Sequence, residues 1–381
     1  MPVPKVSVVI AAYNAERWLG EAISSVLAQT FEDLEAIVVD DGSTDATQAV
    51  ALGICDPRVK CIRRKNGGLA AARNTGIQAA RGEFIGFLDA DDRFAPEKLS
   101  KQLAVFEAEP GLDGVASGFD LIDDHGRWLR RELPWLTSAD VNLRAVLFWD
   151  PILVCSLLLR RECLFRVGLF DESIGFYEDW DLSIRLALAG CRIGWVREAL
   201  YTYRRHGSNM STDPALVTVG TEAAIGFITR LFKKPDLPPE IRGLEGKVLG
   251  NLYLDAAARA FGAGRGPLGQ EYLQAAVEYD PALLEGAPPR WVVALCGHAL
   301  GPLVENGLGY LRTVAAHLPL ADGFQSWNAR RLVTHFHASR AFKLRQSGNR
   351  LPARLSGLRA VARDPRMMGN RGLLSITFRP W

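Results

Sequence analysis

The chain has 381 residues, 48% of them hydrophobic and 23% charged, and its formal net charge is +2. This is the composition of a soluble globular protein, and the length favours one main domain with an appendage. The longest apolar span, residues 291–304, contains His298 and Pro302 and is too short to cross a bilayer, which excludes a transmembrane protein.

The amino terminus and the cysteines predict a cytoplasmic location. Met1 and the prolines that follow lead directly into a predicted strand, without the charged and apolar leader of a signal peptide. The six cysteines form no Cys-x-x-Cys pair and no metal-ligand spacing, and most of them lie in apolar runs. We therefore expect reduced core thiols in a cytoplasmic protein.

Strands and helices alternate along the first part of the chain. Continuous apolar runs predict buried strands at residues 6–12, 36–39 and 84–88, and a short strand is predicted at residues 59–62. Apolar residues at helical spacing predict helices over residues 15–30 and 69–80. This alternation predicts a parallel sheet with helices on both faces, in which ligands bind beyond the carboxyl ends of the strands. Farther along, the sequence predicts a turn between strands within residues 118–131 and further strands at residues 152–159 and 200–205.

Polar residues follow three of these predicted strands. Tyr13 and Asn14 come after the first, Asp40 and Asp41 end the second, and residues 89–92 (Asp-Ala-Asp-Asp) end the fourth. Carboxylates about 4 Å apart repel by roughly 4 kcal/mol at an effective dielectric near 20, so they are stable together when solvated or when a cation lies among them. Oxygen ligands suit Mg²⁺ or Mn²⁺. The alternative is an acidic turn that caps a helix starting near Pro96.

Two common nucleotide-binding signatures are absent. No Gly-x-Gly-x-x-Gly follows the first strand, and no Gly-rich Lys-Ser/Thr loop is present. If the protein binds a nucleotide, a metal ion and side chains must therefore hold the phosphates.

Seven segments in order resemble the glycosyltransferase family 2 pattern on the GT-A fold. They are residues 6–14, 38–45 (VVDDGSTD), 68–74 (GLAAARN), 87–92 (FLDADD), 167–172 (VGLFDE), 178–179 (ED) and 203–206 (YRRH). The resemblance covers about residues 5–210. It implies an α/β GT-A fold with a mostly parallel twisted sheet, and transfer of a sugar from a nucleoside diphosphate sugar with inversion at the anomeric carbon.

The resemblance also implies which residues bind the donor. Ala11 and Tyr13 would line the nucleobase, and Asp41 would accept a hydrogen bond from the base, for which uracil is suitable. The remaining donor-binding residues would be Asn66 and Arg73, near the diphosphate and sugar, and the segment Asp89, Ala90 and Asp91. The alternatives are an ordinary loop aromatic for Tyr13 and a solvated helix arginine for Arg73.

The same resemblance implies the metal ligands and the catalytic base. Asp89 and Asp91 form the Asp-x-Asp motif, with Asp91 as the expected direct ligand of Mn²⁺ or Mg²⁺ and His206 completing the set, whereas the role of Asp92 stays open. Asp179 matches the base that takes the proton of the acceptor hydroxyl, although it could also be a helix N-cap. Two neighbouring residues are expected on the acceptor side, Glu178 and Trp180.

Beyond the catalytic part the sequence is helical. We expect a catalytic domain at residues 1–213, a helical domain at 214–328 and a basic helical tail at 329–381. From residue 330 onward there are twelve Lys and Arg against one acid, Asp364, which gives this tail a net charge of +11 and the remainder −9. Leu351, Leu355, Leu358 and Ala362 share one side of a predicted helix, with arginines around them. Such a helix can lie on an anionic membrane, and the alternative is a solvated helix docked on the acidic body.

These observations predict a cytoplasmic, inverting, metal-dependent glycosyltransferase that uses a UDP-linked sugar. We expect a glycan or lipid-linked acceptor, a role in cell-surface polysaccharide synthesis and peripheral contact with the inner face of the membrane, whereas nucleic acid is an unlikely partner. The alternatives are a sugar nucleotidyltransferase, which would need a Gly-rich basic loop after the first strand, and an inactive glycan-binding relative, which would have lost Asp91 or Asp179. Donor sugar, acceptor, linkage and oligomeric state cannot be derived from the sequence.

Overall fold

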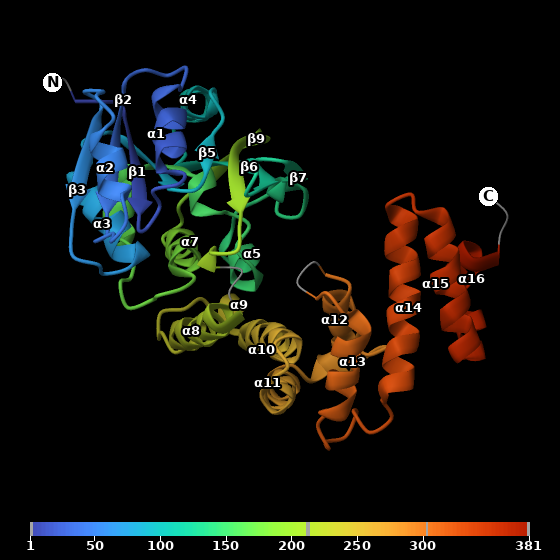
Figure 1. Ribbon diagram of the computed structural model, residues 1–381. Helices are drawn as coiled ribbons and strands as arrows, with labels where there is room; N and C mark the ends of the chain where they lie inside the picture. Colours follow the sequence, from blue (N-terminus) through green and yellow to red (C-terminus); the bar gives the residue numbers. More distant parts are fainter. Residues whose placement is uncertain (1–2, 211–213, 302–303, 379–381) are drawn as a thin grey trace. The chain divides into compact units, whose positions relative to one another are not determined.

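The computed structural model describes residues 3–210, 214–301 and 304–378 (Figure 1). The chain divides into two compact units, residues 1–213 and 214–381, and each is described by itself. The expected domain boundary adjoins residues 211–213, which lie outside the described residues, as does Arg379.

The first four strands form the parallel half of a sheet in the first unit. They are β1 (Val6–Ala12), β2 (Leu34–Asp40), β3 (Val59–Arg63) and β4 (Phe84–Asp89), in the order β3-β2-β1-β4. β1, β2 and β4 are buried along almost their whole length, which explains their unbroken apolar runs. Their register pairs Ala12 with Asp40 and Ala11 with Asp89, so the polar residues that follow lie at one edge.

The second half of the sheet is mixed. The order continues from β4 through β8 (Leu158–Arg160), β6 (Gly114–Asp123) and β9 (Ile193–Arg205) to β5 (Arg93–Phe94), and β7 (Trp128–Glu132) pairs with β6. β8 is antiparallel to β4 and β6, whereas β6 and β9 are parallel. The predicted turn within residues 118–131 joins β6 to β7.

Helices cover both faces of the parallel half. α1 (Leu19–Leu27) and α2 (Thr47–Leu52) lie side by side and connect β1 to β2 and β2 to β3, which moves the chain toward one edge of the sheet. α3 (Leu69–Ala79) connects β3 to β4 and so carries the chain back across the sheet in the opposite direction. Since such crossovers are right-handed, α3 lies on the other face. It packs closely there, because a Cβ on Gly76 would lie 2.3 Å from a methyl carbon of Val9.

The remaining helices of the first unit frame the second half of the sheet. They are α4 (Lys98–Ala108), α5 (Leu143–Phe148), α6 (Arg161–Val167) and α7 (Glu178–Leu188), with 3₁₀ turns at Pro134–Leu136 and Val154–Ser156. The prediction of a strand at residues 152–159 is wrong. These residues form the second of those turns and only the beginning of β8.

The second unit is entirely helical within its described residues. Its α-helices are α8 (Pro214–Phe232), α9 (Pro239–Arg242), α10 (Glu245–Gly262), α11 (Gly266–Tyr279), α12 (Arg290–Ala299), α13 (Gly307–Ala316), α14 (Ala329–Gln346), α15 (Arg350–Arg363) and α16 (Arg371–Phe378). A large apolar core joins α10 to α14, and a smaller one built largely of alanines joins α14, α15 and α16. None of the described helices is both long and apolar enough to span a bilayer.

Candidate functional site

The carboxyl ends of β1 and β2 form the first part of the candidate site. Tyr13 follows β1 and is 52% exposed, so its ring is available for stacking. Asn14 has a positive φ of 48°, and its side-chain oxygen accepts a hydrogen bond from the Thr44 amide at 2.9 Å. This bond joins the loop after β1 to the loop after β2, which fixes the edge where Tyr13 lies.

Asp41 is buried at this edge and organises the neighbouring loop. Its carboxylate accepts hydrogen bonds from the amides of Gly67 and Gly68, at 3.1 and 2.8 Å, and pairs with Arg64 at 3.3 Å. The Gly67 amide also lies 3.2 Å from the other carboxylate oxygen, so these three donors already contact both oxygens of Asp41. Asn66, at the start of the same loop, is exposed.

The structure brings Asp91 and His206 together. Asp91 Oδ2 lies 2.8 Å from His206 Nε2 and accepts a hydrogen bond from the Asn209 amide at 3.2 Å. The other imidazole nitrogen lies 2.8 Å from the Ser208 hydroxyl, and the ring stacks on Trp18 at 4.2 Å between centroids. The second contact of a histidine orients the nitrogen that faces a metal ion, so this arrangement suits a ligand.

Arg204 fastens the end of β9 to the loop after β4. Its side chain donates to the Asp91 carbonyl at 2.9 Å and to the Glu21 carboxylate at 2.6 Å, and its backbone amide donates to Asp92 at 2.8 Å. Burial raises the pKa of Asp92 well above its ordinary value, and the charges of Asp91 and Asp89 add to this shift. Asp92 therefore supports the loop, and its second oxygen is buried without a hydrogen-bond partner within the described residues.

Arg73 joins the loop after β4 to the start of α7. The guanidinium is 3% exposed and bridges Asp89, at 2.8 Å, and Glu178, at 2.5 Å. Two carboxylates thus neutralise its charge inside the protein. Both the expected contact of Arg73 with the donor diphosphate and the expected role of Glu178 toward the acceptor must compete with this ion pair.

Asp179 lies beside this ion pair at the beginning of α7. Burial and then the charge of the Glu178 carboxylate raise the pKa of Asp179 to about 7, although the Arg73 guanidinium opposes the shift. Asp179 is not the N-cap, because that position belongs to Tyr177, which has a left-handed φ of 66°. A carboxyl group that titrates near neutral pH suits a general base.

The other predicted residues differ in their accessibility. Ala11 and Ala90 are each 7% exposed, so they contribute mainly backbone to the edge. Trp180 is 6% exposed, and its indole N–H donates to the Val146 carbonyl at 2.6 Å. Little of this ring is available to an acceptor, so the expected acceptor contact of Trp180 is not carried into the proposed function.

The donor atoms present fit a divalent cation in part. Asp91 Oδ2 and His206 Nε2 lie 2.8 Å apart in direct contact, a separation that two ligands of one ion can also have, and both side chains are held by neighbours. Asp89 faces Arg73 instead, and it also lies in a group with Asp92 and Cys155. Asp91 and His206 are therefore the residues best placed to hold a metal ion, and Asp89 would have to turn from Arg73 to join them.

Sequence reasoning missed residues whose partners are distant in the chain. Asp150 is hydrogen-bonded to the Ser183 hydroxyl at 3.1 Å, and burial together with the charge of Asp179 raises its pKa well above the ordinary value. Asn209 contacts Asp91 across more than a hundred positions in sequence. Neither residue belongs to a recognisable motif, although Asn209 follows His206 closely enough to have been considered.

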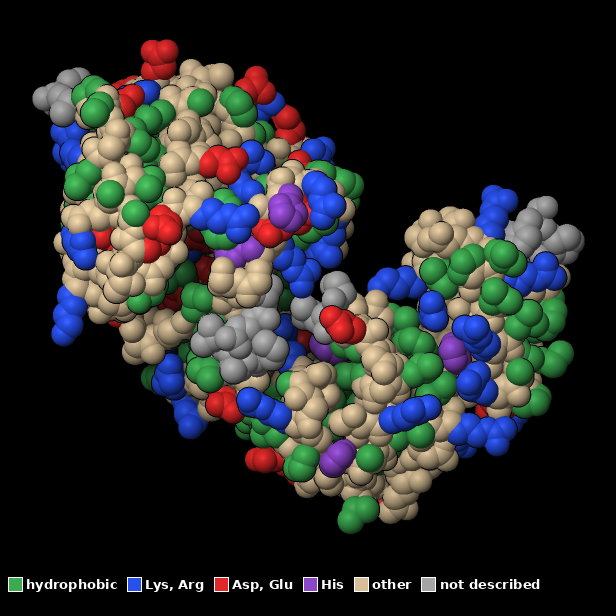
Figure 2. All heavy atoms as spheres, in the orientation of Figure 1, with side chains coloured by type: hydrophobic (Ala, Val, Ile, Leu, Met, Phe, Trp, Pro, Cys, Tyr) green, Lys and Arg blue, Asp and Glu red, His purple; other side chains and the backbone are tan. Residues whose placement is uncertain are grey.

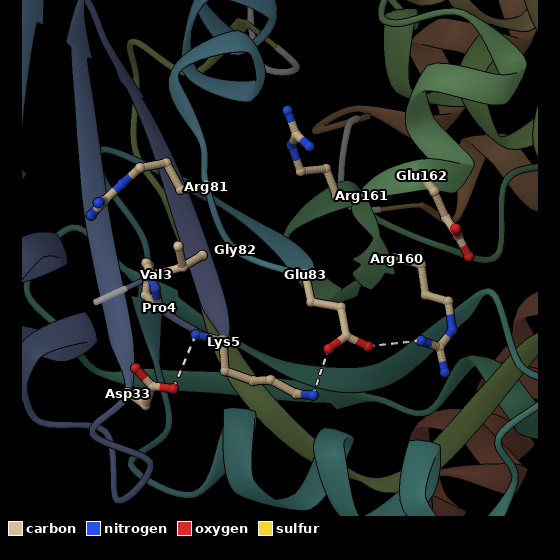
Figure 3. A pocket seen from close by; sticks show the side chains of 10 residues that line it. All are labelled: Val3, Pro4, Lys5, Asp33, Arg81, Gly82, Glu83, Arg160, Arg161 and Glu162. Carbon is tan, nitrogen blue, oxygen red and sulfur yellow. Dashed lines mark hydrogen bonds and ion pairs between the residues drawn. The ribbon is translucent and has the colours of Figure 1, made fainter. Parts of the chain in front are cut away.

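Two other features lie away from this edge. A pocket of about 520 Å³ lies at the amino ends of β1 and β4 (Figure 3), where Glu83 pairs with both Lys5 and Arg160. Asp113, Cys163 and Cys191 also come together with metal-ligand spacing. Arg166 contacts all three, at 2.7 to 3.5 Å, so a guanidinium already supplies the positive charge there. We assign no function to either feature.

Comparisons with known proteins identify the family. Residues 7–165 match the model of the family described as glycosyl transferase family 2. An uncharacterized glycosyltransferase of Rickettsia prowazekii is 35% identical over 239 residues, which are 61% of this chain and 74% of that relative. One of Nostoc sp. is 36% identical over 228 residues, 58% of this chain and 70% of that relative.

Solved structures share the fold. TarS of S. aureus in complex with UDP-GlcNAc has a TM-score of 0.51 at 20% identity, covering 95% of this chain and 92% of that one. The mannosyltransferase PcManGT of Pyrobaculum calidifontis, in complex with GDP-Man and Mn²⁺, has a TM-score of 0.50 at 20% identity, covering 79% and 88%. These neighbours confirm the expected GT-A fold, and with the family match and the relatives they establish that this chain is a glycosyltransferase that belongs to family 2.

Proposed function

We propose that this enzyme is an inverting, divalent-metal-dependent glycosyltransferase that moves a sugar from a nucleoside diphosphate sugar to a hydroxyl group of a glycan or lipid-linked acceptor. One observation carries this proposal. Asp91 and His206 follow the ends of β4 and β9, Asp179 lies in the first turn of α7, and the Arg73 guanidinium links the two places by pairing with both Asp89 and Glu178.

The nucleobase would bind at the ends of β1 and β2. Tyr13 offers an exposed ring for stacking, Ala11 offers backbone, and Asp41 would accept an N–H of the base by sharing the oxygens that now contact Gly67, Gly68 and Arg64. Uracil N–H is such a donor, which supports a UDP-linked sugar. The complexes of TarS with UDP-GlcNAc and of PcManGT with GDP-Man support a nucleotide-sugar donor in general. Asn66 and the segment from Asp89 to Asp91 would approach the diphosphate and the sugar.

Asp91 and His206 would hold the cation, with Asp89 as a further ligand once it leaves Arg73. The imidazole favours Mn²⁺ over Mg²⁺, and the Mn²⁺ bound to PcManGT agrees with this preference. When bound, the cation supplies positive charge that stabilises the departing nucleoside diphosphate. Arg73 is then a positioning residue, because its charge orients Asp89 and Glu178 before the donor binds.

Asp179 would act as the general base. Its ionised carboxylate takes the proton of the acceptor hydroxyl while the acceptor oxygen bonds to the anomeric carbon and the bond to the diphosphate breaks. A single displacement inverts the configuration at that carbon. The pKa of about 7 leaves a substantial fraction ionised at neutral pH and makes the group basic enough to accept a proton.

We propose that the enzyme works in the cytoplasm, in cell-surface polysaccharide synthesis, at the inner face of the membrane. The support is the +11 charge of the tail, which favours an anionic surface, and the absence of a membrane-spanning helix among the described residues. The net charge of −9 over residues 1–329 makes nucleic acid a poor partner for that part of the chain.

Thermal denaturation with a panel of nucleoside diphosphates and their sugars, with and without Mn²⁺, tests the proposal. UDP with Mn²⁺ should raise the melting temperature most, Asp91→Asn should abolish this gain, and Asp179→Asn should keep it while losing transfer. A gain that needs no cation, or that survives Asp91→Asn, would contradict the metal site. An inactive glycan-binding relative would show no transfer to any acceptor, and a sugar nucleotidyltransferase would release pyrophosphate from a nucleoside triphosphate instead.

A further inference from the structure

Helix α15 presents two different faces. Ala353, Gly357 and Ala360 are buried on one side. A Cβ on Gly357 would lie 2.0 Å from Thr377 Oγ1, so the Thr377 side chain of α16 packs directly against α15 at this glycine. This side of α15 is therefore committed to contacts within its own unit, and the helix cannot turn its opposite side inward.

The opposite side carries a row of exposed leucines. Leu351, Leu355 and Leu358 are 68%, 47% and 40% exposed, and their spacing of four and three residues aligns them along the helix. Single exposed leucines are ordinary, but three in one row form an apolar stripe. The sequence pattern predicted that these leucines share a side, and the structure adds that this side faces away from the α14–α16 core.

Arginines border the leucine stripe on both sides. At 100° per residue, Arg354 and Arg359 lie to either side of the row. The surrounding helices offer little negative charge, because Asp364 is the one acid from residue 330 onward and it pairs with Arg366 at 3.0 Å. Figure 2 shows Lys and Arg side chains among hydrophobic ones over these helices.

Positive charge also lies close to a buried histidine of this unit. The pKa of His337, on α14, is lowered to about 4, first by burial and then by Arg363, Arg359 and Arg340. Three arginines of α14 and α15 thus lie close enough to this buried histidine to lower its pKa.

We propose that α15 is a membrane-docking helix whose leucine stripe enters the surface of an anionic phospholipid bilayer while its flanking arginines bind the lipid phosphates. Apolar residues in the centre and cations at the borders are the arrangement of helices that lie in the membrane interface. The purpose of this docking rests on the proposed function, since it would bring the catalytic unit to a lipid-linked acceptor, but the binding itself does not require catalysis.

Flotation of the full-length protein with vesicles tests the proposal. The wild type should bind vesicles of phosphatidylcholine with phosphatidylglycerol, and binding should fall with added salt and be weak on phosphatidylcholine alone. The triple variant Leu351→Ser, Leu355→Ser, Leu358→Ser should bind at least about tenfold more weakly. A matched control, Leu52→Ser, Leu136→Ser, Leu320→Ser, removes three leucines that are more than 60% exposed elsewhere and should bind as the wild type does.

A second variant does not depend on the leucines. Arg354→Gln with Arg359→Gln should weaken binding by about fivefold for each arginine and reduce its salt dependence. Equal binding by the leucine variant and its control would overturn the proposal. Two other results would also overturn it, each combined with no vesicle binding by the wild type. If the wild type self-associates and the leucine variant does not, the leucine stripe contacts a second copy of the chain. If the catalytic unit melts at a lower temperature in the leucine variant, the stripe contacts the acidic remainder of the chain.

Sugar release separates this proposal from the proposed function. Hydrolysis of the nucleotide sugar in solution should be the same in the wild type and in the leucine variant. Loss of vesicle binding with normal hydrolysis would contradict only the docking-helix proposal. Normal vesicle binding without hydrolysis or transfer would contradict only the proposed catalytic function.

Discussion

Arginine side chains are prominent in two regions of this protein, the carboxyl edge of the sheet and helices α14–α16, and their surroundings differ. Arg73 and Arg204 are 3% and 4% exposed and are held by carboxylates at 2.5 to 2.8 Å. Arg354 and Arg359 lie beside exposed leucines in a region with one acid. The first arrangement fixes side chains before a ligand arrives, and the second leaves charge for an external partner.

The largest effect on turnover is expected from substitution of Asp179, the proposed general base. Asp179→Asn should lower kcat by about 10²- to 10⁴-fold, because the amide cannot accept the proton of the acceptor hydroxyl. Steady-state transfer kinetics measure this. The control is Asp181→Asn on the same helix, where the carboxylate pairs with Arg185 at 2.7 Å and should matter little for turnover. Equal losses in both variants would indicate damage to α7 and not removal of a base.

Substitutions of the two kinds of arginine should change the stability of the protein by different amounts. Arg73→Gln leaves Asp89 and Glu178 without their shared cation and should destabilise the catalytic unit by about 3–5 kcal/mol. Arg354→Gln should change stability by less than about 0.5 kcal/mol. Calorimetry can follow the catalytic unit by the transition that shifts with UDP and Mn²⁺. Similar changes in the two variants would remove the distinction between the regions.

The proposed metal ligands give the next effect. His206→Ala should weaken Mn²⁺-dependent binding of UDP by about 10- to 100-fold, since it removes one of the two proposed ligands. Titration calorimetry at several Mn²⁺ concentrations measures this. His125→Ala provides a control at an exposed histidine paired only with Asp124, and should leave binding unchanged. Unchanged affinity in His206→Ala would exclude this residue as a ligand.

The pH dependence is smaller and has a definite sign. The pKa of Asp179 is raised to about 7, so the ionised base is lost as pH falls, and kcat should drop by about tenfold for each pH unit below that value. The raised pKa also means that protonated Asp179 stabilises the fold, and that this contribution is lost as pH rises toward 7. Asp179→Asn should therefore melt slightly higher than the wild type at pH 8, although it is inactive. A lower melting temperature there would contradict the shift.

The sequence predicted β1, β2 and β4 well because these strands are buried on both faces and their apolar runs are nearly unbroken. It failed at residues 152–159, since an apolar run does not distinguish a strand from a buried 3₁₀ turn. The strand expected from Leu200 extends back to Ile193, where its residues are only partly buried and the pattern is weaker.

The site shows the same limit. Short motifs selected Asp91, Asp179 and His206 as candidate site residues, because each lies at or close to the end of a strand or helix. They could not reveal that Arg73 pairs with Glu178, since 105 positions separate the two residues and only the folded sheet joins them. The side of α15 that carries the leucines was predicted, but its outward direction depends on the contact of Gly357 with Thr377.

The configuration of the product tests the central claim most directly. Nuclear magnetic resonance of the transferred sugar, observed early in a reaction with a UDP-sugar of known anomeric configuration and Mn²⁺, should show the opposite configuration at the anomeric carbon. A product with the same configuration as the donor would contradict a single displacement with Asp179 as the base.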